Sequence, residues 1–273
     1  MDVEIFYVIV SVLFLIFACL LIYMYKEAHT DRTIVHQLSF PDFPVSFNRW
    51  SIFLISDIHR RTVSEKMIAN VKDKADIVII GGDLAEKGVQ LQQVEENVRR
   101  LCKLGPTYFV WGNNDYELEQ TSYRELLMKL GVIILDNRSV QFQSPLGEAF
   151  FLVGVDDLST RGDHLQEALR KVKNTHFKIL VSHDPRIIRS VTTEQNIQLL
   201  LSGHTHGGQI RIFGFGPYEK GGVKKVGNTT LFVSNGYGTT AVPLRLGAKA
   251  ETHLITIRHS DSGGVEKGEI LGD

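Results

Sequence analysis

Five short motifs rich in aspartate, asparagine and histidine follow runs of β-forming residues along the chain. In order they are Ser56-Asp57-Ile58-His59, Gly81-Gly82-Asp83, Gly112-Asn113-Asn114-Asp115, Ser182-His183-Asp184 and Gly203-His204-Thr205-His206-Gly207-Gly208-Gln209. The carboxyl ends of buried strands project side chains into a common crevice, so we expect the five motifs to converge. Their best-placed ligands are two carboxylates, one amide and four imidazoles. These O and N donors suit Mn, Zn or Fe and match a soft-metal thiolate site poorly.

Each motif alone has an ordinary structural explanation. An aspartate at a strand end is often a helix cap, and Gly-Asn and Gly-Asp are common turn dipeptides. A lone histidine such as His183 is more often packed than metal-bound. The pair His204-x-His206 is a stronger signal, because glycines on both sides let the backbone turn tightly. Five coincident motifs, each at a strand end, favour a metal centre over five unrelated turns.

The elements that would position these motifs alternate between short apolar runs and amphipathic segments, which predicts an α/β fold. Predicted strands cover residues 34–40, 51–56, 77–80, 107–111, 132–135, 139–142, 149–155, 178–182, 198–202, 209–213, 230–234 and 252–258. Predicted helices cover residues 63–75, 89–104, 122–130, 164–172 and 185–191. The early strands are continuously apolar, as in sheets covered on both faces. The later strands follow one another closely, which indicates a more antiparallel half.

The order Asp-x-His, Gly-Asp, Gly-Asn-x-Asp, Ser-His-Asp and Gly-His-Thr-His resembles the calcineurin-like metallophosphoesterase family. The closing segments Gly236-Tyr237-Gly238-Thr239-Thr240 and Pro243-Leu244-Arg245 are similar to its membrane-anchored bacterial subgroup. The resemblance covers nearly everything after the N-terminal apolar segment. It implies a four-layer α/β/β/α sandwich of two mixed sheets flanked by helices, with the site at the strand ends.

The same resemblance implies two divalent metal ions, for which Mn is our first expectation and Zn or Fe the alternatives. It assigns Asp57, His59 and His206 to the first ion, Asn113, His183 and His204 to the second, and Asp83 to both. Asp83, Asn113, Asn114 and His183 are the expected catalytic residues. In such a site the ions lower the pKa of a bridging water, and the resulting hydroxide attacks phosphorus in line.

Two features depart from the family pattern. Asn114 stands where the family usually has a histidine that acts on the leaving group, and an amide cannot donate a titrating proton near neutral pH. Arg60 and Arg61 follow the first motif where relatives often have glycine. Arg60, Arg61 and Arg245 are therefore candidate contacts for a phosphate or a lipid headgroup, since guanidinium binds phosphate oxygens bidentately. A solvated loop is the alternative for Arg60 and Arg61.

The N-terminal segment predicts a membrane anchor. Ile5 through Tyr25 carry no charge, and about 20 apolar residues span the hydrocarbon core of a bilayer. A cleaved signal peptide is the alternative, but it would place basic residues first and small residues at a cleavage site. Lys26 and Arg32 after the segment favour a cytoplasmic catalytic domain on a single-pass protein of the cell membrane. We therefore expect an anchor at 1–25, a linker at 26–32, the catalytic domain at 33–258 and a flexible tail at 259–273.

The expected function is metal-dependent hydrolysis of a phosphomonoester, phosphodiester or pyrophosphate on a membrane-associated, possibly lipid-linked, substrate. Cyclic nucleotides remain open as substrates, and a membrane-tethered metal-binding scaffold with little turnover is the alternative. Lys and Arg number 30 against 31 Asp and Glu, for a formal charge of −1, so we expect no nucleic-acid partner.

Overall fold

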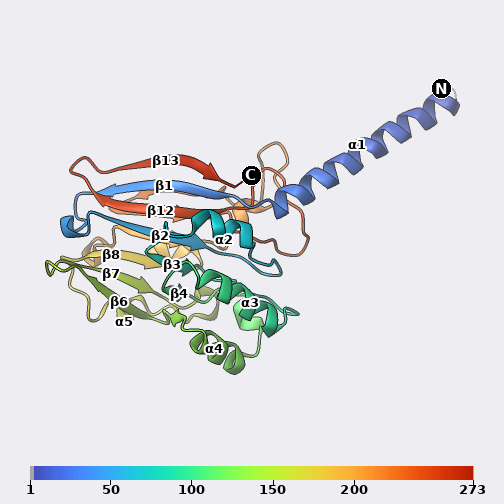
Figure 1. Ribbon diagram of the computed structural model, residues 1–273. Coiled ribbons are helices and arrows are strands. Elements are labelled where there is room, and N and C mark those ends of the chain that lie inside the picture. Colours follow the sequence, from blue (N-terminus) through green and yellow to red (C-terminus); the bar gives the residue numbers. More distant parts are fainter. Residues whose placement is uncertain (1–2, 273) are drawn as a thin grey trace.

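Two mixed β-sheets pack face to face in the computed structural model, which describes residues 3–272 (Figure 1). Within these residues the first sheet has seven strands, in the order β13 (Gly264–Leu271), β1 (Thr33–Phe40), β12 (Thr252–His259), β2 (Arg49–Ile55), β3 (Ile77–Ile80), β4 (Thr107–Phe109) and β5 (Ile133–Ile134). The second has six, in the order β10 (Gly222–Val226), β11 (Thr229–Val233), β9 (Leu199–Ser202), β8 (Phe177–Val181), β7 (Ala149–Gly154) and β6 (Arg138–Gln143).

Helices cover the outer faces of both sheets, which confirms the predicted four-layer sandwich. The described helices are α1 (Val3–His29), α2 (Glu65–Val71), α3 (Leu91–Leu101), α4 (Gln120–Lys129) and α5 (Leu165–Leu169), with short 3₁₀ helices between them. Helices α2, α3 and α4 share a buried cluster with the first sheet. Helix α5 and the 3₁₀ helix Pro185–Ser190 share one with the second sheet.

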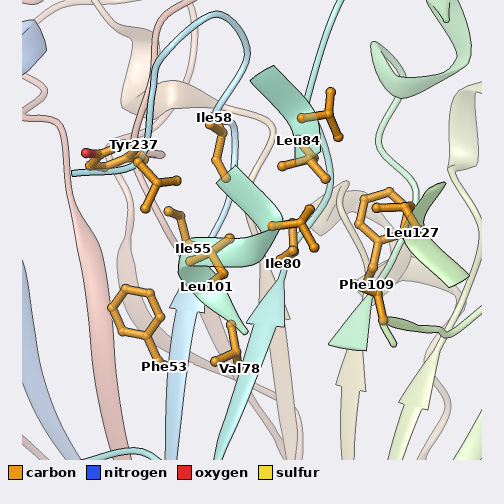
Figure 2. Packing of buried hydrophobic residues seen from close by; sticks show 14 of the residues in the cluster. Phe53, Ile55, Ile58, Val78, Ile80, Leu84, Leu101, Phe109, Leu127 and Tyr237 are labelled. Carbon is orange, nitrogen blue, oxygen red and sulfur yellow. The ribbon is translucent and has the colours of Figure 1, made fainter. Parts of the chain in front are cut away.

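The continuous apolar runs of the central strands follow from burial on both faces. In β2, Ile52 and Leu54 pack between the two sheets, whereas Phe53 and Ile55 point to the helices. Figure 2 shows this outer cluster, where side chains of β2 and β3 lie against Leu101 of α3. Burying each such side chain contributes about 1.5–3 kcal/mol. This burial on both faces explains why residues 52–55 of β2 and 77–80 of β3 are uniformly apolar.

Two predictions about the later part of the chain are wrong, and one strand there was missed. Residues 209–213 do not form a strand, because Gln209 and Phe213 have positive φ values of 49° and 50° and pairing is limited to isolated bridges. The expected flexible tail at 259–273 contains β13, which pairs antiparallel with β1. Strand β10, which we did not predict, pairs with β11 although its side chains are largely exposed. Both β13 and β10 are polar edge strands, whose pairing satisfies backbone groups without an apolar signature.

Helix α1 is the one described helix long and apolar enough to cross a membrane, with a mean hydropathy of 3.1 in its most apolar window. A signal sequence would have the same properties. The helix extends through the predicted linker to His29, and Met24, Glu27 and Ala28 are buried against the folded domain. The remainder of the helix is largely exposed. Its last two turns therefore belong structurally to the domain.

Arg61 joins the end of α1 to the site loops. Its guanidinium donates to the carbonyls of Ala28 at 3.2 Å, His29 at 2.7 Å and Tyr237 at 2.7 Å, and to the carboxylate of Asp31 at 2.8 Å. It also stacks on the Tyr237 ring at 3.7 Å. Planar guanidinium suits this combination of stacking and several donated hydrogen bonds.

Replacing Arg61 with alanine should lower the free energy of unfolding by about 2–4 kcal/mol, because several carbonyls and a carboxylate lose their donor. The measurement is urea unfolding of the full chain in detergent, followed by the fluorescence of Trp50 and Trp111. Arg60→Ala is the matched control: the Arg60 side chain is 71% exposed, so the change should be within about 0.5 kcal/mol. Equal losses for the two variants would contradict this role for Arg61.

Candidate metal centre

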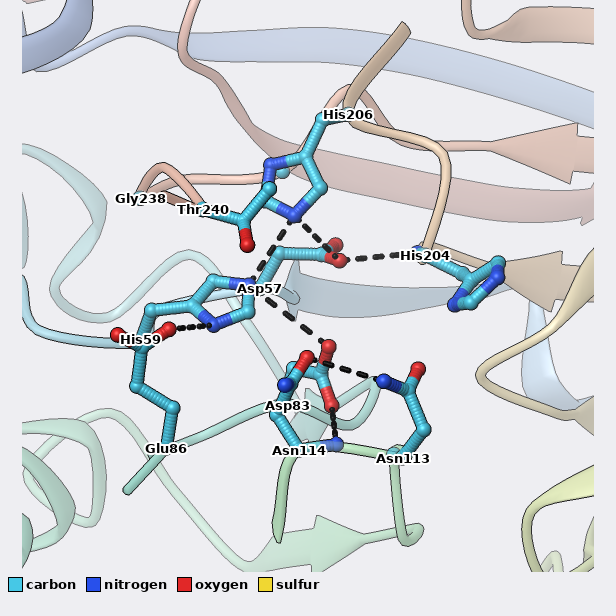
Figure 3. Close-up of polar contacts among 12 residues, drawn as sticks. Asp57, His59, Asp83, Glu86, Asn113, Asn114, His204, His206, Gly238 and Thr240 are labelled. Carbon is cyan, nitrogen blue, oxygen red and sulfur yellow. Dashed lines mark hydrogen bonds and ion pairs between the residues drawn. The ribbon is translucent and has the colours of Figure 1, made fainter. Parts of the chain in front are cut away.

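All five motifs meet at one end of the sandwich, as predicted. Strands β2, β3 and β4 are parallel in one sheet, and β8 and β9 are parallel in the other. The loops after these strands are joined directly: the Asp57 backbone N–H donates to the Gly82 carbonyl at 3.0 Å, and the Gly203 N–H donates to the His183 carbonyl at 3.0 Å. Figure 3 shows the resulting cluster of carboxylates, amides and imidazoles.

Two overlapping groups of side chains have the spacing of metal ligands. Asp57, His59 and His206 form one group, and Asp57, Asp83 and His183 form the other; within each, the potential ligand atoms lie within 4.8 Å of one another. Nε2 of His59 lies 3.0 Å from Nε2 of His206. Asp57 is common to both groups. The Asp83 carboxylate belongs to the second group and also approaches the first, since its Oδ2 is 3.1 Å from Nε2 of His183 and 3.7 Å from Nε2 of His59.

Asn113 and His204 stand at the edge of these two groups. Both line the pocket that opens above Asp83. The His204 imidazole is 3.8 Å from the Asp184 carboxylate, and its backbone N–H donates to Oδ1 of Asp57 at 3.0 Å. The site therefore contains all seven residues that we expected as ligands, five of them in the two tight groups.

Two ligand atoms are buried with no hydrogen-bond partner among the described residues, as a bound cation would require. These atoms are Oδ2 of Asp57 and Oδ1 of Asn113, whereas Nε2 of His183 has the Asp83 carboxylate at 3.1 Å. An unsatisfied buried polar atom costs about 1–3 kcal/mol. The imidazole nitrogens Nε2 of His59 and Nε2 of His206, which face each other at 3.0 Å, likewise need a proton or a cation between them. The residues present thus fit a pair of divalent ions held by O and N donors.

The far ring nitrogens of His183 and His59 each have a polar partner, as is usual for metal-binding histidines. Nδ1 of His183 donates to the Gly81 carbonyl at 2.8 Å, which leaves its Nε2 directed at Asp83. Nδ1 of His59 lies 2.9 Å from the Glu86 carboxylate. The sequence motifs did not indicate this role for Glu86, because it lies beyond the Gly-Asp motif in a loop without a distinctive pattern.

The electrostatics of the site keep the shared aspartate ionised. Burial opposes the charged form of Asp83, but His183 and His59 hold the pKa of Asp83 well below its ordinary value. Burial, together with His59 and Arg245, lowers the pKa of His206 to about 3, so this imidazole is neutral. Burial lowers the pKa of His183 as well, but the neighbouring aspartates outweigh it and raise that pKa to about 10. A cation binding there would therefore displace a proton from His183.

Backbone strain is concentrated at the ligands. Positive φ values between 49° and 71° occur at Asp57, His59, Asp83, His204 and His206. Non-glycine residues rarely adopt this left-handed region, and each such residue costs about 1–3 kcal/mol. Gly82, with φ of 85°, packs so closely that a Cβ would lie 2.5 Å from Nδ1 of His183. The loops thus adopt an unfavourable backbone conformation in order to direct several side chains at one point.

Asp115, the last residue of the third motif, organises the loops without pointing into the site. Its carboxylate accepts hydrogen bonds from the backbone N–H groups of Asp83 at 2.8 Å, Gly112 at 2.9 Å and Ala85 at 3.2 Å, and from the Tyr123 hydroxyl at 2.8 Å. Burial and the nearby Asp83 carboxylate raise the pKa of Asp115 to about 7, against the effect of these donors.

Asn114 lies in the pocket beside Asn113 and orients it. The side-chain amide of Asn113 donates to Oδ1 of Asn114 at 3.1 Å, which leaves Oδ1 of Asn113 free to face the site. Asn114 in turn donates to Glu117 at 3.0 Å through its side chain and to Oδ1 of Asp83 at 2.8 Å through its backbone.

The three arginines expected to contact substrate lie in different environments. Arg60 is exposed and pairs with Glu86 at the rim, so its substrate contact stays a prediction. The Arg61 guanidinium donates hydrogen bonds to two carbonyls at the end of α1. Arg245 is completely buried, donates to the carbonyls of Asn235 and Gly238 at 2.7 Å, and lies 3.2 Å from Nδ1 of His206. The prediction that Arg245 contacts phosphate is therefore wrong, because its guanidinium is used inside the protein.

The pocket above the two groups has a volume of about 480 Å³. Its lining includes polar residues of the site, among them Asp83, Asn113, Asn114 and His204. Apolar and aromatic side chains also line it: Ile210, Pro217, Tyr218, Ala241 and Val242. The pocket can therefore hold a molecule with a charged end and an apolar end.

Replacing Asp115 with asparagine should lower the free energy of unfolding by about 2–4 kcal/mol and weaken metal binding about 10- to 100-fold, because an amide places an N–H against the backbone donors. Both quantities can be measured by urea unfolding and by Mn titration. Tyr123→Phe removes one hydrogen bond to the same carboxylate and should cost only about 1 kcal/mol. If Asp115→Asn lowers neither the free energy of unfolding nor the affinity for Mn by more than Tyr123→Phe does, Asp115 does not organise the loops.

The chain is similar in sequence to a known protein family. Residues 51–208 match the family model described as calcineurin-like phosphoesterase. The chain is 47% identical over 209 residues to the uncharacterized protein YpbG of Bacillus subtilis, which covers 76% of this chain and 80% of YpbG. It is 27% identical over 255 residues to the uncharacterized metallophosphoesterase YkuE of the same organism, covering 87% of this chain and 89% of YkuE.

A similar protein from Bos taurus is described as a transmembrane protein with a metallophosphoesterase domain. It is 33% identical over 254 residues, which cover 83% of this chain and 56% of that protein. Among solved structures, a 5'-nucleotidase precursor from Thermus thermophilus superposes with a TM-score of 0.51 at 15% identity, covering 76% of this chain and 55% of that one. This structural likeness shows the shared fold.

Proposed function

The chain belongs to the calcineurin-like phosphoesterase family, and from this membership we propose that it hydrolyses a phosphoester or pyrophosphate carried by a membrane-associated substrate. The observation that carries the proposal is the pair of overlapping Asp/His groups, with buried ligand atoms that face one another and lack hydrogen-bond partners among the described residues. A scaffold that only tethers the domain would have no physical need for so costly an arrangement.

In this proposal one divalent ion is held by Asp57, His59 and His206, and the other by Asn113, His183 and His204. Asp83 contacts both, and Mn is the first expectation for the metal. When bound, such ions acidify a water that serves as the nucleophile and stabilise negative charge on the phosphoryl oxygens. The protein contributes the fixed positions of the ligands, which are held from behind by Glu86, Asp115 and the Gly81 carbonyl.

The apolar side of the pocket and helix α1 support a membrane-associated substrate. Val242 and Ala241 line both the pocket and a smaller cavity that includes Ala28 and His29 at the end of α1. We propose that α1 is an uncleaved single-pass anchor, with the catalytic domain in the cytoplasm. The Bos taurus relative is described as a transmembrane protein. The catalytic domain would begin near residue 33 and include strand β13.

The first test is the hydrolysis of bis-p-nitrophenyl phosphate and p-nitrophenyl phosphate by the full chain in detergent, metal-free and with added Mn, Zn or Fe. The full chain is needed because the last turns of α1 are part of the domain. We expect metal-dependent turnover that falls at least about 100-fold in Asp83→Asn, which removes a shared ligand. Asp261→Asn, which changes a fully exposed carboxylate, should leave the rate unchanged.

A folded protein that binds two ions and hydrolyses neither ester would favour the tethered scaffold. Turnover that persists in Asp83→Asn would contradict the proposed site.

The amide side chain of Asn114 leads to a prediction of how the rate of hydrolysis depends on the leaving group. Because its amide has no titrating proton, rates with a series of aryl phosphodiesters should fall steeply as the pKa of the leaving phenol rises. Asn114→His should reduce this slope and favour the poorer leaving groups. The same series measured with both proteins, under conditions where chemistry limits the rate, provides the test. Equal slopes for the two proteins would argue against a role for this position in leaving-group departure.

A further inference from the structure

A short hairpin beside the pocket exposes three large apolar side chains to solvent. We call residues 212–215, Ile212-Phe213-Gly214-Phe215, the aromatic hairpin. Phe213 is 96% exposed, Phe215 82% and Ile212 61%. Clustered exposed apolar residues of this kind mark a surface that meets a partner or a membrane.

The aromatic hairpin is held in place by hydrogen bonds. Ile212 and Phe215 exchange both backbone hydrogen bonds at 2.9 Å. The Arg211 guanidinium donates to the carbonyls of Gly207 at 2.9 Å, Gly214 at 2.6 Å and Tyr218 at 2.5 Å. The aromatic side chains are therefore displayed on a fixed turn.

The turn itself does not explain a phenylalanine at its tip. Phe213 has φ of 50° and Gly214 has φ of 86°, as in the two-residue turns that favour asparagine, aspartate or glycine at both central positions. A phenylalanine there is unfavourable for the backbone, and its side chain contributes little inside the protein. Local strain of this kind points to a function for the side chain outside the fold.

The hairpin lies at the end of the molecule from which α1 leaves. The backbone N–H of Arg211 donates to the carbonyl of Leu246 at 2.7 Å, and the neighbouring Arg245 donates its backbone N–H to the carbonyl of Met24 in α1 at 3.0 Å. One short segment thus connects the hairpin to the helix. Figure 1 shows loops in the orange part of the colour scale beside the base of α1.

Further apolar side chains continue this surface into the pocket. Val242 is 45% exposed and Tyr218 52%, and both line the pocket together with Ile210 and Pro217. Tyr23 and Tyr25, exposed on the last turns of α1, are of the residue type that concentrates where a membrane helix meets the headgroups. Exposed aromatic and apolar side chains therefore occur at the expected membrane boundary, on the hairpin and at the mouth of the pocket.

We propose that the aromatic hairpin inserts into the interfacial layer of the same bilayer that α1 spans, and so holds the mouth of the pocket against the lipid surface. This inference rests on the proposed anchor and is independent of the proposed hydrolysis. Phenylalanine and isoleucine side chains on a rigid turn are suited to the boundary between headgroups and acyl chains.

The test places a tryptophan at Phe213 in the full chain, reconstituted in vesicles of phosphatidylcholine and phosphatidylglycerol. Lipids brominated on the upper part of the acyl chains quench a tryptophan that reaches them. We expect the F213W emission to be blue-shifted and to lose intensity to nearly the same extent as Y23W, which reports the end of α1. L146W is the control, because Leu146 is 81% exposed in the turn between β6 and β7, away from α1.

The unsubstituted protein supplies the background from Trp50 and Trp111. Emission from F213W that is as red-shifted and unquenched as that from L146W, while Y23W is quenched, would overturn the proposal; the hairpin would then be free or covered by a protein partner. Loss of quenching at Y23W as well would overturn the anchor and the hairpin together. Quenching at F213W in a protein without phosphoesterase activity would support the membrane contact and contradict only the proposed function.

Discussion

Asp83 is the residue through which the loops of the site are joined, and the rest of the arrangement depends on its position. Its carbonyl accepts hydrogen bonds from the N–H groups of Ile58 and His59, its own N–H donates to Asp115, and its carboxylate accepts from the N–H of Asn114 and faces His183. Loops from both sheets thus meet on one residue. A displacement of Asp83 would move ligands from both groups at once, because none of these loops is positioned independently.

This arrangement opposes local conformational preference. Five of the seven expected ligands have φ values in the left-handed region, and ligand atoms of Asp57 and Asn113 are buried without a hydrogen-bond partner among residues 3–272. Both conditions are unfavourable for an isolated chain, so the surrounding structure must stabilise them. The two sheets supply that stability through the apolar layers on their faces. The carboxylates of Asp115 and Glu86 then fix the loops from behind.

Helix α1 and the site share the same supporting segments. Tyr237 follows β11, stacks on Arg61 and donates its hydroxyl proton to Asp31 at 2.8 Å. Arg245 is linked through its backbone to Met24 and through its guanidinium to the region behind His206. The orientation of the apolar helix is therefore coupled to the geometry of the site. Under the proposed function, this coupling would fix the direction in which the pocket faces relative to the helix.

The amino-acid sequence alone was sufficient to identify the layered fold and the residues that converge at the site, whose role as metal ligands stays a proposal. Ligands such as Asp57, Asp83 and His206 follow continuous apolar strands, most of them beside glycine, and this signal is local because a strand end is a local feature. The alternation of strands and helices likewise followed from the periodicity of apolar residues.

Tertiary structure decided what depends on residues far apart in the chain. Arg245 could contact phosphate or support a histidine, and only its burial behind His206 distinguishes the two. Strand β13 has little apolar character, and it forms because β1 offers it an edge. The support that Glu86 gives to His59, and the backbone hydrogen bonds that link Arg211 to Leu246 and Arg245 to Met24 of α1, also arise from packing between distant segments. Local sequence patterns report the preferences of a segment, whereas these features are determined by the partners that the fold brings to it.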